Sequence, residues 1–188
     1  MVATKGGFGS GSGSSTEDLR TELELSFDRL QTDRIGLYYV HRLHSEVPIG
    51  ETMELLAEYV NAGRIEHVGL SEVTVDQIEE ARQTLPIAAV QNEFSLSERK
   101  HDEVVDHCEN EGIAFVPFFP LRTADADGVE EVARSTGATP NQVIIAWLLS
   151  RSPAMLPIPG TLSLDHAREN LAALDLELSE DDLQRLDS

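Results

Sequence analysis

The 188-residue sequence has a single cysteine, Cys108, and no long run of apolar residues. One cysteine excludes an internal disulfide framework. No window offers the roughly 20 apolar residues of a membrane span, and the chain does not open with the basic-then-apolar pattern of a signal peptide. We therefore expect a soluble, cytoplasmic protein with no membrane partner.

Lysine is equally scarce, since Lys5 and Lys100 are the only two, and the formal net charge is -20. Binding to nucleic acid or to an anionic membrane needs clustered Lys and Arg, so this composition argues against both partners. An acidic, lysine-poor surface is typical of proteins that stay soluble in high salt, where screening weakens self-repulsion. The composition therefore favours a halophilic protein, with an ordinary acidic bacterial protein as the alternative.

Side chains that could anchor a core are missing from residues 9–15, which are rich in Gly and Ser. Such a composition predicts a flexible loop, either natural or introduced as an engineered splice. No other stretch suggests a boundary, so we expect residues 1–188 to form a single domain.

Short apolar runs and amphipathic segments alternate along the rest of the chain. After the run that leads to Lys5, strands are expected at residues 35–41, 67–71, 87–91, 113–117 and 155–158. Helices are expected at residues 16–30, 49–62 and 100–110, and after the capping residues Thr74, Thr139, Ser163 and Ser179. Strands that alternate with helices indicate a mostly parallel sheet covered by helices. We count about six such units, although a closed eight-unit barrel usually takes about 250 residues.

Lys5 and His41 each stand at the end of an apolar run. If the sheet is a parallel barrel, residues at the carboxyl ends of its strands share the mouth of the active site. The alternatives are a solvated loop lysine and a core histidine that is satisfied by a backbone carbonyl.

Several phrases occur in an order that resembles the aldo/keto reductase family. They are Ala3-Thr4-Lys5-Gly6-Gly7, Asp33-Arg34-Ile35 leading to Tyr39-Val40-His41-Arg42, Gly63 to Ser71, Val90-Gln91-Asn92, Phe118 to Leu121 and Ile158-Pro159-Gly160-Thr161. The resemblance implies a (β/α)8 barrel that reduces aldehydes or ketones to alcohols with NADPH, and a small-molecule carbonyl substrate. This chain would be an incomplete barrel that lacks the first two strands.

The family uses a tetrad of Asp, Tyr, Lys and His, in which Tyr gives the proton, and Lys5 and His41 match two of its members. Hydride attack on a carbonyl builds negative charge on the oxygen, so a nearby cation or proton donor lowers the barrier. A partly desolvated Lys can depress the pKa of a neighbouring hydroxyl, and an imidazole can orient the carbonyl.

The resemblance also implies a set of cofactor-binding residues. Ser71 and Gln91 would hold the nicotinamide carboxamide, and Phe118 would stack on its ring, with a core aromatic as the alternative for Phe118. The helix that opens at Gly160, Thr161 and Ser163 would receive the 2′-phosphate at its amides. Arg168 lies near that first turn, and the pair that meets the adenine matches Glu169 and Asn170. Glu72 stands where many relatives have Asn, and the choice between NADP and NAD stays open.

The Asp and Tyr of the tetrad have no match in this sequence, because the resemblance places them in two β/α units before Lys5. Tyr38, Tyr39 and Tyr59 lie in other elements. The chain is therefore a fragment of a reductase with impaired activity, an active site without its acid, or a noncatalytic module that binds a nucleotide or a partner. A sheet without two strands exposes its edges, which favours a homodimer.

Overall fold

The computed structural model describes residues 1–7, 15–44, 47–122 and 127–187. The chain divides into two compact units, which we call unit 1 (Met1–Gln91) and unit 2 (Asn92–Ser188). The predicted loop at residues 9–15 lies, apart from Ser15, outside the described residues. The expectation of a single domain over residues 1–188 stays a prediction.

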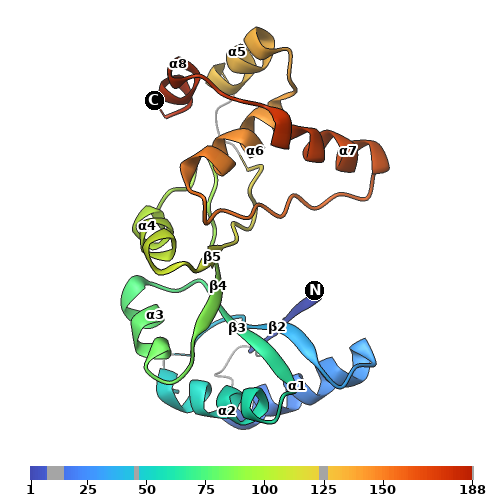
Figure 1. Ribbon diagram of the computed structural model, residues 1–188, viewed down its shortest axis with the longest axis vertical. Coiled ribbons are helices and arrows are strands. Elements are labelled where there is room, and N and C mark those ends of the chain that lie inside the picture. The colour runs from blue at the N-terminus through green and yellow to red at the C-terminus, as the bar shows by residue number, and fades with distance from the viewer. Residues whose placement is uncertain (8–14, 45–46, 123–126, 188) are drawn as a thin grey trace. The chain divides into compact units, whose positions relative to one another are not determined.

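Unit 1 is a parallel sheet with helices between its strands (Figure 1). Its elements in chain order are β1 (Ala3–Gly6), α1 (Thr16–Leu30), β2 (Ile35–Val40), α2 (Ile49–Asn61), β3 (Ile65–Ser71), α3 (Val75–Arg82) and β4 (Ile87–Gln91). Each strand pairs in parallel with the next one along the chain, with a register shift between Val68 and Gly69. The predicted parallel α/β architecture is confirmed for this unit.

Local capping explains where the helices of unit 1 begin and end. Ser15 and Thr74 each accept a hydrogen bond from the third residue of the following helix in a complete capping box. Gly63 has a φ of +71°, a conformation that favours glycine, and it follows the end of α2. The buried faces of α1 and α2 include Leu19, Leu23 and Met53, as the helical spacing predicts.

Unit 2 is mainly helical. Its elements are α4 (Asp102–Glu111), β5 (Ala114–Phe115), α5 (Asp127–Thr136), α6 (Pro140–Arg151), α7 (Leu164–Ala172), the 3-10 helix η1 (Ala173–Asp175) and α8 (Glu180–Leu186). The sequence analysis did not anticipate α5. The core forms around α6, where the Trp147 ring stacks on Phe94 with centroids 6.0 Å apart. Asp187, directly after α8, accepts hydrogen bonds from Trp147 Nε1 and from the Arg99 guanidinium.

The strand predicted at residues 155–158 is reduced to one parallel bridge between Phe115 and Met155. Pro157 and Pro159 alternate with the residues that would continue it. Proline has no N–H to donate to a ladder, so the pairing stops after Leu156, whose N–H donates to Phe115 O at 2.8 Å. The described residues hold the five strands β1 to β5, and this bridge stands where the sixth predicted strand would lie.

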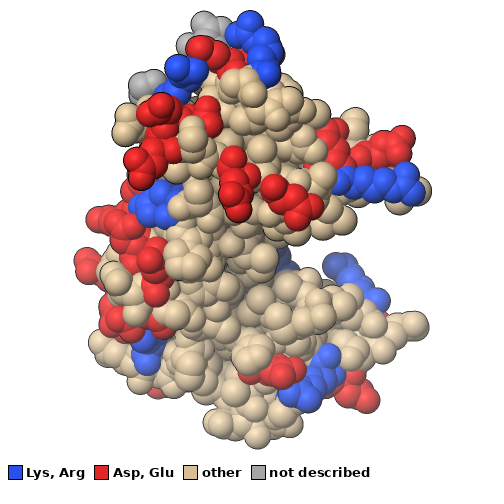
Figure 2. All heavy atoms as spheres, turned by 45° about the horizontal axis from the view of Figure 1, so that its top comes forward, with Lys and Arg blue, Asp and Glu red and all other residues tan. Residues whose placement is uncertain are grey.

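Acidic side chains dominate the charged atoms on the face drawn in Figure 2. This pattern agrees with the net charge of -20. The interpretation of that charge as adaptation to high salt stays a prediction, as does a cytoplasmic location. Among the described residues, no helix is both long enough and apolar enough to cross a membrane.

Candidate active site

The carboxyl ends of the strands in unit 1 bring together four predicted site residues. Lys5 lies in β1, His41 directly follows β2, and Ser71 and Gln91 end β3 and β4. Parallel strands place their carboxyl ends along one edge of a sheet, which is where ligands bind in open α/β sheets. The sequence order alone spreads these residues over most of unit 1, and strand register makes them neighbours.

Hydrogen bonds link this group directly. Lys5 Nζ donates to Gln91 Oε1. Ser71 is the register partner of Gln91, and both side chains are buried. The backbone N–H of His41 donates to the backbone carbonyl of Gly6 at 2.7 Å, which ties the end of β2 to the residue after Lys5. Lysine, hydroxyl and carboxamide groups thus meet at one edge of the sheet, and the backbone of His41 is tied to the same edge.

Arg42 belongs to the same group, although the sequence analysis gave it no role. Its Nη1 donates to His41 O at 2.7 Å and to Ser71 Oγ at 3.2 Å. The guanidinium therefore reaches from the end of β2 to the end of β3. The signal that could have found it is its position directly after His41 in the sequence.

Burial and mutual repulsion act on the charges of this group. Burial lowers the pKa of the Lys5 ammonium, and the positive charge of Arg42 lowers it further. Burial likewise lowers the pKa of His41, with Lys5 and Arg42 acting in the same direction and Glu22 of α1 opposing them. The neutral imidazole is therefore favoured, and it can donate one hydrogen bond and accept another.

The surroundings of the three tyrosines do not lower the pKa of any of their hydroxyls toward neutral pH. Tyr39 is the register partner of Lys5, but burial raises the pKa of its hydroxyl to about 12. Burial and then the Glu22 charge raise the pKa of Tyr38. Tyr59 donates its hydroxyl proton to Glu24 at 2.7 Å, on the helix side of the sheet. That none of the three matches the tyrosine of the tetrad stays a prediction.

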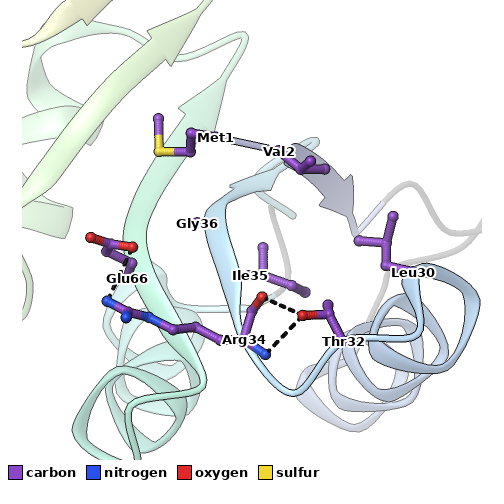
Figure 3. A pocket seen from close by; sticks show the side chains of 8 residues that line it. All are labelled: Met1, Val2, Leu30, Thr32, Arg34, Ile35, Gly36 and Glu66. Carbon is purple, nitrogen blue, oxygen red and sulfur yellow. Dashed lines mark hydrogen bonds and ion pairs between the residues drawn. The ribbon is translucent and has the colours of Figure 1, made fainter.

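A cavity of about 430 Å³ lies at the opposite edge of this sheet, where the strands begin (Figure 3). Its walls include Met1, Val2 and Ile35, and the Arg34–Glu66 ion pair at 3.0 Å closes one side. The cavity includes none of the predicted site residues.

In unit 2, Phe118 is half-buried and its ring packs edge-to-face on Phe119, with centroids 5.2 Å apart. The Phe118 N–H donates to Asn92 O at 3.1 Å. Phe119 has a φ of +52° and carries Arg122 over its exposed ring at 4.3 Å. Phe118 as a whole is therefore neither fully buried nor fully exposed, and its stacking role stays a prediction.

The predicted phosphate-binding turn lies at the start of α7. Ser163 is its N-cap and accepts from His166 N at 3.4 Å, while Thr161 Oγ1 accepts from Ser163 N at 3.1 Å. Gly160 and Thr161 are exposed. The first turn of α7 is thus open to solvent, with its amide groups directed toward the N-terminal end as in any helix.

Two of the remaining three predicted cofactor residues, Arg168 and Glu169, already have side-chain partners. Arg168 pairs with Asp165 at 3.2 Å on the exposed side of α7. Glu169 accepts the hydroxyl proton of Thr139 at 2.5 Å and so braces the start of α6. Asn170 is half-buried. A part for these residues in cofactor binding stays a prediction.

Comparison with known proteins decides the family. The family model described as "Aldo/keto reductase family" matches residues 1–188. The chain belongs to the aldo/keto reductase family. Pyridoxine 4-dehydrogenase of Escherichia coli (strain K12) is 47% identical over 146 residues, which are 76% of this chain and 51% of that protein. An uncharacterized oxidoreductase of Schizosaccharomyces pombe, C215.11c, is 40% identical over 173 residues, or 90% of this chain and 56% of that protein.

Solved aldo/keto reductases share the fold. The thermostable reductase Tm1743, in complex with the inhibitor epalrestat, aligns with a TM-score of 0.86 at 32% identity, over 92% of this chain and 66% of that one. A reductase from Klebsiella pneumoniae in complex with NADPH aligns with a TM-score of 0.82 at 28% identity, over 91% of this chain and 64% of that one. The predicted class, an α/β fold of the reductase barrel type, is confirmed. The chain spans little more than half the length of the curated relatives named above.

Proposed function

We propose that this aldo/keto reductase chain binds NADPH and takes part in the reduction of an aldehyde or ketone to an alcohol, with Lys5 and His41 in the catalytic roles. The observation that carries the proposal is the meeting of Lys5, His41, Ser71 and Gln91 at the carboxyl edge of the unit 1 sheet. The NADPH complex of the Klebsiella pneumoniae relative supports the choice of cofactor.

The side chains at this edge suit a nicotinamide. A carboxamide offers both donors and an acceptor, and Ser71 and Gln91 present a hydroxyl and an amide side by side. The bond from Lys5 occupies Gln91 Oε1, which leaves the Gln91 Nε2 group to donate. The resemblance predicts that Phe118 and the turn before α7, both in unit 2, bind the same cofactor; Phe118 is half-buried, and Gly160 and Thr161 are exposed. When bound, NADPH would supply the hydride.

The chemistry assigned to Lys5 and His41 follows from their surroundings. Lys5 would place positive charge near the carbonyl oxygen as negative charge builds on it. The neutral His41 imidazole would donate a hydrogen bond to that oxygen and orient it. Without a tyrosine acid, the proton must come from His41 or water, so we expect the 188-residue chain by itself to be nearly inactive.

The test combines cofactor binding with complementation. We expect weak but measurable NADPH binding in a fluorescence titration, with no binding at millimolar cofactor as the contrary result. Co-expression with the first two β/α units of a full-length relative should raise NADPH oxidation with an aromatic aldehyde about 100-fold to 10,000-fold, the usual contribution of a general acid.

Lys5→Met should abolish the complemented activity. Lys100→Met is the matched control, because Lys100 is the only other lysine and its side chain is exposed in unit 2. Turnover by the chain alone that is lost in His41→Ala would show that His41 gives the proton.

The alternative is a noncatalytic module that binds a nucleotide or a partner through the same edge. The lack of a match to the Tyr and Asp of the tetrad in this sequence supports it. NADPH binding without turnover, even after complementation, would support this module.

The homodimer is also a proposal. Within the described residues β1 pairs only with β2, so its other edge can accept a strand from a second copy. Sedimentation equilibrium of the 188-residue chain would reveal a monomer or a dimer.

A further inference from the structure

Glu72 directly follows Ser71, the last residue of β3, at the carboxyl edge of the unit 1 sheet. Its backbone N–H donates to the backbone carbonyl of Gln91 at 3.1 Å, which extends the pairing of β3 with β4 by one bond. Glu72 is partly exposed, whereas Ser71 and Gln91 are buried. A carboxylate therefore stands beside the two side chains that are proposed to hold the nicotinamide carboxamide.

The backbone of Glu72 adopts an uncommon conformation. Its φ is +55°, in the left-handed region, where residues other than glycine are rare and Asn and Asp are several-fold enriched. The Asn that the resemblance places here in many relatives suits this conformation. Glutamate has no such preference, so the local backbone does not account for it. The carboxylate itself is the feature to explain.

The neighbours of Glu72 present hydrogen-bond donors to a ligand. A guanidinium only donates, so Ser71 Oγ accepts in its contact of 3.2 Å with Arg42 Nη1, and the serine hydroxyl keeps its proton to donate. Lys5 Nζ donates to Gln91 Oε1, which leaves Gln91 Nε2 as a donor. These two donors suit the oxygen of a carboxamide. The NH₂ group of the carboxamide needs an acceptor, and an ionised carboxylate can only accept.

We propose that Glu72 accepts a hydrogen bond from the carboxamide NH₂ group and thereby shifts the cofactor preference of the chain from NADPH toward NADP⁺. The oxidised nicotinamide ring carries a positive charge, whereas the reduced ring is neutral. A carboxylate beside the ring attracts only the charged form. Lys5 and Arg42 oppose this effect, but they are equally present in the variants compared below. For cofactor binding itself this inference rests on the proposed function.

The test compares the affinities of NADP⁺ and NADPH for the 188-residue chain by NMR titration, so the readout does not depend on turnover. The ratio of the two dissociation constants cancels the contacts that both forms share. Glu72→Gln keeps the side-chain length and an acceptor oxygen but removes the charge. It should lower the preference for NADP⁺ over NADPH about 10-fold, the order expected for two unit charges a few ångströms apart at a partly exposed site.

Three further variants separate the charge from other effects. Glu72→Asp keeps the charge and should keep most of the preference. Glu72→Asn removes the charge, suits the left-handed backbone, and should lose the preference as Glu72→Gln does. Glu80→Gln is the matched control, because Glu80 is an exposed residue of α3 and its loss changes the net charge equally. The same ratio in the unaltered chain and in Glu72→Gln, or an equal change in Glu80→Gln, would overturn the inference.

The outcomes separate the two proposals. Binding of both cofactor forms with a ratio that no Glu72 variant changes would leave the proposed function intact and remove this inference. No binding of either form at millimolar concentration would overturn the proposed function, and this inference with it.

Discussion

The predicted site residues of unit 1 are held by strand register, whereas the predicted cofactor residues of unit 2 lie on exposed turns and on a helix surface. Lys5, Ser71 and Gln91 contact one another or their strand neighbours, with the two polar side chains buried. Gly160, Thr161 and Arg168 are exposed, and their contacts are to residues close in sequence. The first arrangement depends on the whole sheet, and the second depends on local capping.

This difference indicates how far the structural effect of a substitution will spread in each unit. Interior positions of a parallel sheet are shared by several strands, so a change at one of them moves the others. An exposed helix start is stabilised mainly by its own cap, so a change there stays local. Matched substitutions in the two units can test this comparison directly.

The largest difference should come from two Gly→Ala changes. A Cβ on Gly69 would lie 2.5 Å from the Tyr39 ring and 3.0 Å from Ala89 O, whereas a Cβ on Gly160 would meet no atom within 4 Å. Gly69→Ala should lower the free energy of unfolding by about 2 kcal/mol through overpacking. Gly160→Ala should leave it unchanged or raise it by about 0.5 kcal/mol. Urea denaturation measures both, and equal effects would break the comparison.

Removing two helix N-caps in unit 2 should give a smaller difference in the free energy of unfolding than the two glycine substitutions. Thr139 caps α6 in a complete capping box and also donates to Glu169, whereas Ser163 caps α7 through one hydrogen bond of 3.4 Å. We expect Thr139→Ala to lower the free energy of unfolding by about 1.5 kcal/mol and Ser163→Ala by about 0.5 kcal/mol. Thr139→Ser should restore most of the loss because it keeps the hydroxyl. A larger loss in Ser163→Ala would contradict a purely local role for that cap.

The smallest effect concerns the charge of His41. Its pKa is lowered in the folded chain, so the unfolded chain binds more protons, and this residue's contribution to stability falls as pH drops below about 6.5. Glu22→Gln should lower the pKa of His41 further, because Glu22 is the charge that raises it. Asp165→Asn is the control in unit 2, where the carboxylate faces Arg168. NMR titration of the His41 ring proton measures the change, and a rise in Glu22→Gln would refute the assigned sign.

Local features of the structure were predictable from the sequence because they depend on nearby residues. The capping boxes at Thr74, Thr139 and Ser179 begin helices where the spacing predicts them. Three parallel strands follow the apolar runs that end at His41, Ser71 and Gln91. The strand predicted at residues 155–158 failed because proline removes ladder donors, an effect that apolar character alone does not show.

The sequence by itself therefore determined the family, the α/β class and the residue types that stand at strand ends. Only the tertiary structure decided that Lys5 bonds to Gln91 and that Arg42 reaches Ser71. The physical reason is that helix starts depend on interactions within a few residues, whereas side-chain contacts between strands depend on which strands become neighbours. That neighbourhood is fixed by parallel pairing between residues that are far apart along the chain.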